Sequence, residues 1–422
     1  MTLNRRHFLK AAGAGLALAN IPTIHAATPP RVIVIGGGFA GATVAKYIRL
    51  WSNFSVDVTL VDPKPQHTSC VLSNLILNNQ LPFSKLKLPY SSLESKYGVN
   101  VVRDKAVEIN GPGNQIRLKN GGWRSYDRLV IATGIGFKKP NGLDSKLSPH
   151  AWIAGGQTKL LARQLAGMNA ESTFVMTIPK SPYRCPPGPY ERACLVANMF
   201  VQRGLTSVDN PRVMVLDANS GIQAERETFS HAFNSIYRNV VQYVPDAEVH
   251  NVDSSSGMVY TTAGTFQGDI LNVIPQNRAT SFVRRQGLTD GDNWAPVDPT
   301  TYESVLSEFQ GVHIIGDSQN TNQPKSAHMA NAQAKICTDA ILRSLSGIPT
   351  DTIERLRNIT TNSACYSPIT KDQASWLTAN YFYNPDLEMM QLRHVGEAEE
   401  WNHSNYKQMF VWASNLFTDC FG

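Results

Sequence analysis

The chain has 422 residues, of which 39 are basic and 33 acidic, so its formal net charge is +6. With 42% hydrophobic and 17% charged residues, it is too apolar for a disordered protein and long enough for two or three domains. Its mild positive charge argues against a nucleic-acid-binding protein, which usually carries a strongly basic face. The longest apolar run, residues 11–21, is shorter than the roughly 18 residues that a membrane span needs, so we expect no transmembrane segment.

The first 27 residues have the composition of a targeting segment. They carry three basic residues and no acidic one, and without them 395 residues with a net charge of +3 remain. The stretch from Asn4 to Lys10 contains Arg5-Arg6 followed by Phe8-Leu9, and small residues end the segment at Ala26-Ala27. This pattern resembles a twin-arginine export signal and predicts a folded, cofactor-loaded redox protein in the periplasm, where disulfides persist. The alternative is an ordinary N-terminal helix with two adjacent arginines.

A dinucleotide-binding pattern opens the remaining chain. The apolar stretch 31–35 predicts a buried strand, the turn after it carries Gly36, Gly38 and Gly41, and residues 42–50 have helical character. In such a turn the first glycine allows the tight bend, the second lets a pyrophosphate approach the backbone, and the third lets helix and strand pack closely. A second predicted strand ends in Asp62, which is placed to bind a ribose hydroxyl. The alternative is a glycine-rich turn without a ligand.

Two later segments favour FAD over NAD as the ligand. Residues 126–134, which end in Thr133-Gly134, resemble the strand and turn that return to the adenine half in flavoproteins with two dinucleotide-binding domains. Residues 311–317, which end in Gly316-Asp317, resemble the later strand whose aspartate binds the ribityl chain of the flavin. The other role open to Asp317 is that of a helix N-cap.

The middle of the chain keeps an α/β pattern but lacks a second glycine-rich turn. The predicted strand at 172–178 runs into a segment rich in proline, residues 179–189. Proline fixes φ and removes backbone N–H donors, so this loop is unsuited to hold a pyrophosphate. We therefore predict a Rossmann-like domain that has lost its NAD(P) site, and electrons that reach FAD from another donor.

Three cysteine-containing stretches resemble one known family. They are residues 69–74 around Cys70, residues 183–193 around Cys185 and residues 364–367 around Cys365. All three are similar to the flavoprotein subunit of flavocytochrome c sulfide dehydrogenase, and the resemblance runs from residue 28 to residue 422. Sulfide:quinone reductases are more distant relatives of the same superfamily.

The resemblance implies a role for each of these cysteines. Cys70 matches the cysteine that is bonded covalently to the flavin, although Val71 stands where the relatives carry an aromatic residue. Cys185 and Cys365 match a redox-active disulfide beside the flavin, with Cys365 expected on the flavin side. A structural disulfide is the alternative for this pair, and a buried apolar thiol is the alternative for Cys70. A metal site at His67 and Cys70 lacks further ligands, so we expect no metal.

Local chemistry is consistent with reactivity at Cys185. The residue follows Arg184 in the proline-rich segment, and a nearby cation favours a thiolate. Attack of hydrosulfide on a disulfide is thiol–disulfide exchange with the smallest thiol. The pairing of the other three cysteines, Cys194, Cys337 and Cys420, stays open. If a helix begins near Pro189, Cys194 is too far from Cys185 to form a disulfide with it. Cys337 is expected in the middle of a helix, with its thiol in the hydrophobic core.

Two charged residues have two interpretations each. Glu191 follows the Cys185 loop, where it is either a general base for hydrogen sulfide or an acid in the first turn of a helix. Lys325 precedes the helix predicted at 326–344, where it either stabilises negative charge on a reduced flavin or is solvated.

The predicted fold is α/β, with two Rossmann-like domains arranged as in glutathione reductase and a small C-terminal domain. The FAD-binding domain comprises residues 28–151 and 269–350, the vestigial nicotinamide domain 152–268, and the C-terminal domain 351–422. The last domain contains 11 aromatic residues in 72, as expected of a packed domain or an interface. In the resembling family it covers the flavin and helps to dock the cytochrome.

The predicted activity is oxidation of sulfide or polysulfide, with electrons passing through FAD to a cytochrome c subunit or a soluble cytochrome c. The chain has no Cys-x-x-Cys-His motif, so haem is expected only on a partner chain. A sulfide:quinone reductase is one alternative. Another is an accessory flavoprotein of a Sox-type sulfur-oxidation system without steady sulfide turnover.

Overall fold

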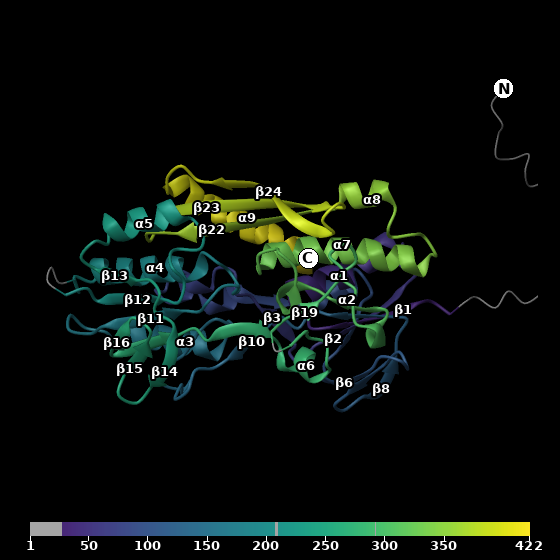
Figure 1. The fold of residues 1–422 in the computed structure, drawn as a ribbon, viewed down its shortest axis with the longest axis horizontal. Helices are drawn as coiled ribbons and strands as arrows, with labels where there is room; N and C mark the ends of the chain where they lie inside the picture. Colours follow the sequence, from purple (N-terminus) through teal and green to yellow (C-terminus); the bar gives the residue numbers. More distant parts are fainter. Residues whose placement is uncertain (1–27, 207–209, 292) are drawn as a thin grey trace, which may run out of the picture.

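The computed structural model of the chain describes residues 28–206, 210–291 and 293–422. Figure 1 shows one α/β part on the right, a second on the left and a smaller C-terminal part above both. The export signal expected in residues 1–27 lies outside the described residues and stays a prediction.

The first α/β part is built on a five-stranded parallel sheet. Its strands, in spatial order, are β20 (Val312–Ile314), β9 (Arg128–Ile131), β1 (Arg31–Ile35), β2 (Asp57–Val61) and β5 (Asn100–Val102). These strands are short apolar runs that are largely buried, as expected of a parallel sheet covered on both faces. Helices α1 (Phe39–Trp51) and α7 (Ala327–Leu345) pack against each other next to this sheet. The three antiparallel strands β6 (Ala106–Asn110), β7 (Gln115–Leu118) and β8 (Gly122–Ser125) extend from it.

The second α/β part repeats this plan. Its parallel sheet has the order β13 (Val241–Val244), β12 (Val213–Asp217), β11 (Phe174–Ile178) and β17 (Ile270–Val273). It also contains helices α3 (Gly156–Ala166), α4 (Gly188–Gln202) and α5 (Arg226–Asn234), and the antiparallel strands β14 (Val249–Asp253), β15 (Met258–Thr261) and β16 (Gly264–Gln267). Since β17 pairs with β11, the boundary predicted after residue 268 is a few residues too early.

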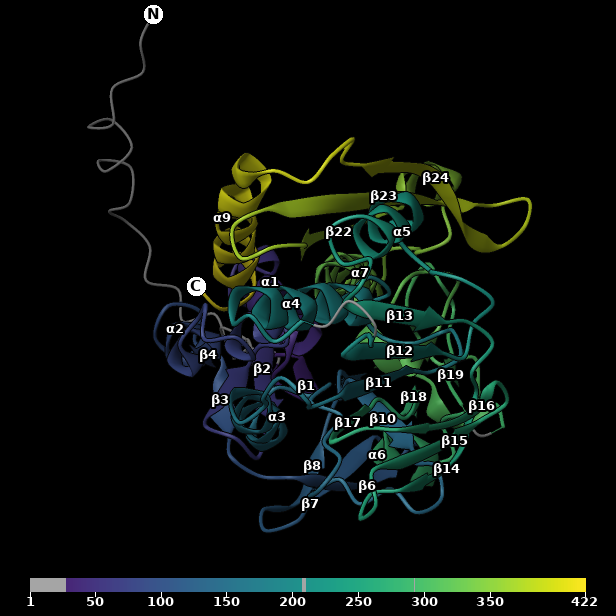
Figure 2. The ribbon, with the colours of Figure 1, turned by 90° about the vertical axis from the view of Figure 1, so that its left-hand side faces the viewer.

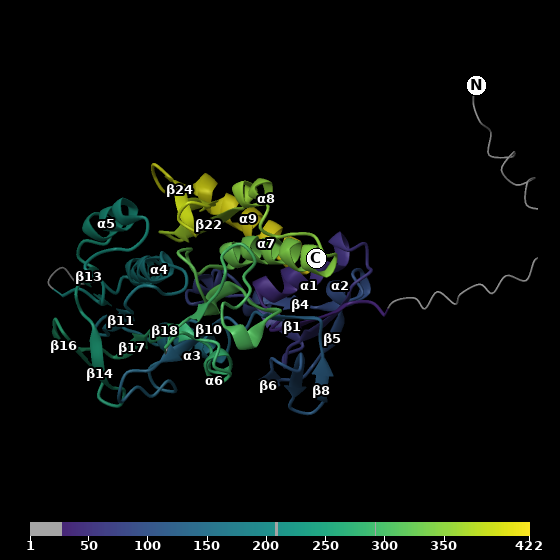
Figure 3. The ribbon, with the colours of Figure 1, turned by 45° about the vertical axis from the view of Figure 1, so that its right-hand side comes forward.

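The C-terminal part is a three-stranded antiparallel sheet with a long helix. The strands are β22 (Thr360–Pro368), β23 (Ala374–Asn384) and β24 (Met389–Glu397), and the helix is α9 (His403–Phe421). Figures 2 and 3 show this sheet lying across α7 and α4, over the boundary between the two α/β parts. The short helix α8 (Ile353–Asn358) connects α7 to the sheet.

Shorter elements complete the chain. They are β3 (Gln66–Thr68), β4 (Lys87–Pro89), α2 (Ser91–Ser95), β10 (Ile135–Lys138), β18 (Gln276–Ala279), α6 (Ser281–Arg285), β19 (Ala295–Pro296) and β21 (Gln319–Asn320), with the 3-10 turns η1 (Ser73–Ile76), η2 (Phe83–Leu86), η3 (Ser307–Phe309) and η4 (Gly316–Ser318). Antiparallel pairing of β10 with β18 joins the two segments that connect the α/β parts.

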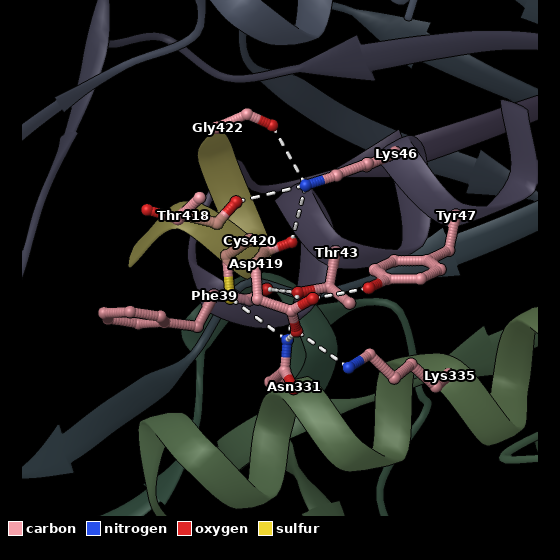
Figure 4. Close-up of polar contacts among 10 residues, drawn as sticks. All are labelled: Phe39, Thr43, Lys46, Tyr47, Asn331, Lys335, Thr418, Asp419, Cys420 and Gly422. Carbon is pink, nitrogen blue, oxygen red and sulfur yellow. Dashed lines mark hydrogen bonds and ion pairs between the residues drawn. The ribbon is translucent and has the colours of Figure 1, made fainter. Parts of the chain in front are cut away.

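A polar cluster fixes the end of α9 to α1, as Figure 4 shows. The ammonium of Lys46 donates to the backbone oxygens of Thr418, Asp419 and Gly422 over 3.1, 3.1 and 2.9 Å. Carbonyls in the last turn of a helix have few backbone N–H groups left to accept from, and the lysine supplies a donor. The carbonyl of Thr418 also accepts from the N–H of Gly422 over 2.9 Å. As a result Phe421 packs on His67, with ring centroids 5.6 Å apart.

Candidate active site

The glycine-rich turn lies between β1 and α1, and each predicted glycine has a distinct environment. Gly36 has a φ of +99°, and a Cβ there would lie 2.5 Å from the backbone oxygen of Ala132. A Cβ on Gly41 would lie 1.8 Å from the backbone oxygen of Gly36, so helix and turn leave no room for a side chain. A Cβ on Gly38 would meet nothing closer than 3.6 Å, and Gly38 borders a cavity. The turn therefore offers the open backbone that a pyrophosphate needs.

Asp62 follows β2 and supports this turn. Its Oδ2 accepts a 2.8 Å hydrogen bond from the N–H of Gly37, and its Oδ1 accepts one of 2.8 Å from the N–H of Lys64. The hydroxyl of Tyr90 donates to the backbone oxygen of Gly37 over 3.0 Å. The carboxylate thus lies beside the turn, as predicted, and its bond to a ribose stays a prediction.

Three other residues predicted for the cofactor lie at neighbouring strand ends. The hydroxyls of Thr133 and Thr280 are 2.8 Å apart, and the N–H of Gly316 donates to Gln333 over 3.1 Å. Gly134 and Gly316 border the same cavity as Gly38 and have φ angles of +76° and +74°. The chain can bend this sharply there because glycine lacks a Cβ.

Asp317 is buried in the same cavity, in the turn η4 after β20. Its Oδ2 lies 3.8 Å from Nη1 of Arg184, and burial raises the pKa of the carboxyl while Arg184 and Lys325 oppose that rise. Asp317 is not a helix N-cap, because Ser326 caps α7 by accepting from the N–H of Met329. A carboxylate is therefore available to hydroxyl groups of a ligand.

Lys325 is buried, so the interpretation as a solvated lysine is wrong. Its ammonium donates to the backbone oxygen of Gln319 over 2.7 Å and lies 3.8 Å from the ring centroid of Trp294. Burial lowers the pKa of Lys325 to about 8, and Asp317 partly opposes this shift. The side chain does not border the cavity, and its action on a flavin stays a prediction.

The residues around this cavity fit the predicted dinucleotide. Nε2 of His67 is buried and has no hydrogen-bond partner among the described residues, and its ring lies next to Gly38. An unpartnered buried nitrogen beside an open glycine turn and a buried carboxylate suits the polar groups of FAD. Phe39 and Phe421 pack on the same imidazole, so the end of α9 helps to close this side of the cavity.

A second cavity adjoins the first and contains the two other predicted cysteines. Cys70, Arg184, Ser326 and Ala327 border both cavities, and Cys185 and Cys365 border the second. Burial raises the pKa of the Cys70 thiol, and Arg184 opposes that shift. Cys70 is thus located where the dinucleotide cavity meets the cavity with the cysteine pair.

Cys185 and Cys365 lie side by side as unpaired thiols. Cys185 is in the proline-rich loop with a φ of +58°, its N–H donates to the backbone oxygen of Lys325 over 2.7 Å, and Cys365 comes from β22. A hydrogen bond with Cys365 and burial raise the pKa of Cys185 well above its ordinary value. Arg184 lowers it by less, so the expected thiolate-favouring effect of this cation is outweighed in the unpaired form.

Glu191 borders the second cavity from the first turn of α4. It is only 9% exposed, and burial raises its pKa to about 8. Its Oε1 accepts a 2.9 Å hydrogen bond from the amide of Asn74, whose Oδ1 accepts one of 2.9 Å from Nε of Arg192. A carboxyl with this pKa can exchange a proton near neutral pH, so both interpretations of Glu191 agree with its position.

Asn74 and Arg192 are site residues that the sequence analysis did not identify. Both belong to the stretches that carry the family resemblance. The Arg192 guanidinium is buried and also donates to Asn272 and to the backbone oxygens of His150 and Ala151. This network fixes the orientation of the Glu191 carboxyl.

The remaining cysteines are buried and unpaired. Cys194 lies within α4, which begins at Gly188 as expected, and Cys337 lies within α7 in the core of the first α/β part. Cys420 lies in α9, where its sulfur accepts from the amide of Asn331.

In the described parts of the chain, no three His, Cys, Asp or Glu side chains are grouped as metal ligands. Nor does the described chain contain a helix with the length and apolarity of a membrane span.

Comparisons with known proteins match two successive parts of the chain to known families. Residues 30–156 match the family model "Pyridine nucleotide-disulphide oxidoreductase", and residues 158–275 match "Sulfide dehydrogenase (flavocytochrome c) flavoprotein chain, central". Mitochondrial sulfide:quinone oxidoreductase from Mus musculus is 23% identical over 72% of this chain and 69% of its own length. The sulfide dehydrogenase flavoprotein chain from Chlorobaculum thiosulfatiphilum is 50% identical over 46 residues, which are 11% of this chain and 94% of that sequence.

A solved structure shows the same fold. The sulfide:quinone oxidoreductase from Aquifex aeolicus superposes with a TM-score of 0.74 at 15% identity, over 92% of each chain. The predicted α/β architecture with two Rossmann-like domains is confirmed. With the neighbouring cysteines Cys185 and Cys365, the buried carboxyl and the dinucleotide cavity, these matches lead to one conclusion: the chain belongs to the sulfide-oxidising flavoproteins with the pyridine nucleotide–disulphide oxidoreductase fold.

Proposed function

We propose that the chain is the flavoprotein component of a periplasmic sulfide dehydrogenase, which oxidises sulfide at Cys185 and Cys365 and delivers electrons through FAD to a cytochrome c. The observation that carries the proposal is the shared wall of the two cavities. Cys70 and Arg184 border both, so a flavin held by the glycine turn would extend toward the cysteine pair.

The cysteine pair suits a sulfide substrate. In the oxidised enzyme Cys185 and Cys365 form a disulfide; hydrosulfide bonds to one sulfur while the other leaves as a thiolate. Glu191, ionised, accepts the proton that the sulfide gives up, and its bond from Asn74 keeps the carboxyl at the cavity. Bound FAD supplies the acceptor for the two electrons. The thiolate product lies near Arg184, whose charge lowers the pKa of Cys185.

The flavin is attached covalently through Cys70 in this proposal. The motif around Cys70 and its location between the cavities support the assignment. Gly36, Gly38, Gly41, Asp62 and Asp317 would hold FAD without that bond as well.

NAD(P)H is not the electron donor in this proposal. Asp217, at the end of β12, corresponds in topology to Asp62, at the end of β2. Its carboxylate is buried and accepts hydrogen bonds from Tyr190 over 2.7 Å, from Tyr243 over 2.8 Å and from the N–H of Asn219 over 2.9 Å. An acid that holds two tyrosines in this way is not free to bind a ribose, and the loop after β11 holds prolines in place of glycines.

A cytochrome c is the proposed acceptor, with haem on a partner chain. The similarity to the Chlorobaculum thiosulfatiphilum flavoprotein chain and the export signal expected in residues 1–27 support it. The similarity to sulfide:quinone oxidoreductases favours a quinone as the second candidate acceptor. If the chain has an accessory Sox-type role, sulfide should reduce neither cytochrome c nor quinone in steady turnover.

One experiment separates these functions. The purified chain is mixed anaerobically with sulfide, flavin absorbance is followed, and a soluble cytochrome c or a short-chain ubiquinone is then added. We expect flavin bleaching by sulfide and reoxidation by cytochrome c. Reoxidation by quinone alone would favour the second candidate, and absence of bleaching would contradict sulfide oxidation.

A further inference from the structure

Glu225 is a buried carboxyl for which the proposed reaction has not yet given a role. It is 1% exposed, precedes α5 and has a φ of +49°, a conformation that is uncommon for a residue other than glycine. Its Oε2 accepts a hydrogen bond from the hydroxyl of Ser367, while its Oε1 has no hydrogen-bond partner among the described residues. Burying a carboxyl that is only partly satisfied destabilises a fold, so its presence points to a function.

The partner of Glu225 lies on the same strand as the reactive cysteine. Ser367 follows Cys365 by two positions in β22, and side chains two positions apart in a strand share a face. Cys365 and Pro368 border the cavity with the cysteine pair. The hydroxyl of Ser367 therefore connects the Glu225 carboxyl to the part of β22 that borders this cavity. Figures 1 and 2 show α5 beside β22.

Other acids lie on both sides of Glu225. Toward the cavity is Glu191, and the charges of Glu191 and Glu225 both act on the thiol of Cys194 in α4. Toward the solvent is Glu397, an exposed residue at the end of β24. The charge of Glu225 interacts with Glu191 and Cys194 of α4 and with Glu397 of β24, and Glu227 of α5 also acts on Glu397. The hydroxyls of Ser367 in β22 and Ser375 in β23 favour the ionised form of Glu225.

The pKa values of the two buried acids, Glu191 and Glu225, are close to each other. Burial raises the pKa of Glu191 to about 8 and that of Glu225 to about 7, and burial also raises the pKa of Glu397. Groups with similar pKa values near neutrality can exchange a proton without a large uphill step.

The proposed reaction requires such an exchange, and the inference rests on that function. Hydrosulfide opens the disulfide to a persulfide and a thiolate and gives up one proton. Removal of two electrons by bound FAD then joins these two sulfurs as a trisulfide, so each hydrosulfide oxidised to bound zero-valent sulfur releases one proton and two electrons. A haem acceptor takes only the electrons, so the proton must leave a cavity whose carboxyl, Glu191, is buried.

We propose that Glu225, together with Ser367, relays this proton from Glu191 and the cavity with the cysteine pair toward Glu397 at the surface. Glu225 borders neither the cavity with the cysteine pair nor the cavity beside the glycine turn, so it acts through Glu191 as a proton-relay residue. Its two carboxyl oxygens allow it to receive a proton on one and pass it on from the other.

The test compares Glu225→Gln with wild type and with Glu354→Gln, a matched change at an exposed glutamate in the first turn of α8. Sulfide-dependent steady-state reduction of cytochrome c is measured from pH 6 to 9 in H2O and D2O, with FAD content, thermal midpoint and the rate of flavin reduction by dithionite. We expect Glu225→Gln to slow turnover about tenfold or more, enlarge the solvent isotope effect and leave dithionite reduction unchanged. Glu354→Gln should match wild type.

A second variant protects the test against a folding defect. Ser367→Ala keeps the carboxyl but removes its hydroxyl partner, and we expect it to slow turnover and enlarge the isotope effect to a smaller extent. A lower thermal midpoint with wild-type turnover and isotope effect in both variants would overturn the relay and leave a structural role. Wild-type enzyme that sulfide does not reduce would instead overturn the proposed function, and the relay with it.

Discussion

The side-chain amide of Asn74 donates a 2.9 Å hydrogen bond to Oε1 of Glu191, which lies 117 positions further along the chain. Asn74 is in turn held by the buried guanidinium of Arg192. The bond connects the stretch around Cys70 to the loop and helix that follow Cys185. The residue that we propose as proton acceptor is thus oriented by the segment that we propose as the flavin attachment site.

This relationship makes a prediction about pH. Burial raises the pKa of Glu191 from 4.5 to about 8, so the carboxyl is mostly protonated at neutral pH and becomes a base as the pH rises through 8. We expect the rate of flavin reduction by sulfide to rise over this range and the Glu191→Gln variant to be slow at every pH. Stopped-flow flavin absorbance from pH 6 to 9 measures both.

The same pKa predicts a change in stability. A carboxyl with a raised pKa in the folded state contributes stability below its unfolded pKa, and that contribution is lost as the pH rises to the folded pKa. Wild type should therefore lose stability relative to Glu191→Gln between pH 4.5 and about 8. Urea unfolding at several pH values measures the free energy of unfolding of both proteins. If the two free energies changed with pH in the same way, the raised pKa of Glu191 would be contradicted.

The cysteine pair gives the clearest mutational prediction. Cys185→Ser and Cys365→Ser should each abolish flavin reduction by sulfide, because a serine oxygen neither forms the disulfide nor retains the sulfur. Each single variant should behave like the double variant, and dithionite should still reduce the flavin.

Cys337→Ala is the control and should leave flavin reduction by sulfide unchanged. Cys337 is a buried thiol on α7 and borders neither cavity. A structural disulfide predicts another outcome for the pair: stability falls by about 2–5 kcal/mol while sulfide turnover persists in the folded protein.

Covalent attachment of the flavin predicts a simple chemical result. After acid denaturation, flavin should remain with the wild-type polypeptide and should be released from Cys70→Ala. The variant should still bind FAD when folded, because the glycine turn and Asp317 are unchanged. Release of all flavin from the wild type would show that Cys70 forms no such bond.

Two glycine substitutions separate folding from cofactor binding. Gly41→Ala should prevent folding of the first α/β part, because its Cβ would lie 1.8 Å from a backbone oxygen. Gly38→Ala meets nothing closer than 3.6 Å and should fold, yet bind FAD more weakly because the methyl group enters the cavity. Circular dichroism and flavin content distinguish the two, and equal FAD binding by Gly38→Ala and wild type would argue against a pyrophosphate at this turn.

The proposed loss of the nicotinamide site is tested with NADH. Micromolar NADH should not bleach the flavin anaerobically, whereas rapid bleaching would contradict the proposal. Tyr190→Phe removes one bond to buried Asp217 and should cost about 1–3 kcal/mol of stability, measured by urea unfolding. The variant should remain insensitive to NADH because the prolines after β11 are unchanged.

The sequence by itself determined the local features of this protein. The glycine spacing at 36–41, the buried strands and the strand-end residues Asp62 and Asp317 follow rules that operate over a few neighbouring residues, and the two Rossmann-like domains followed from them. The middle-domain boundary was placed a few residues too early because periodicity does not reveal which sheet a short strand such as β17 joins.

Only the tertiary structure decided how distant residues meet. Cys185 and Cys365 are 180 positions apart, and Glu225 and Ser367 are 142 positions apart, so no local pattern records either contact. The family resemblance implied the first pair, whereas nothing in the sequence indicated the second. Lys325 and Glu225 both look like surface residues in the sequence, yet packing of the C-terminal sheet and the neighbouring loops buries them. Burial raises or lowers a pKa by removing water from the charged form, and that removal depends on the whole surrounding fold.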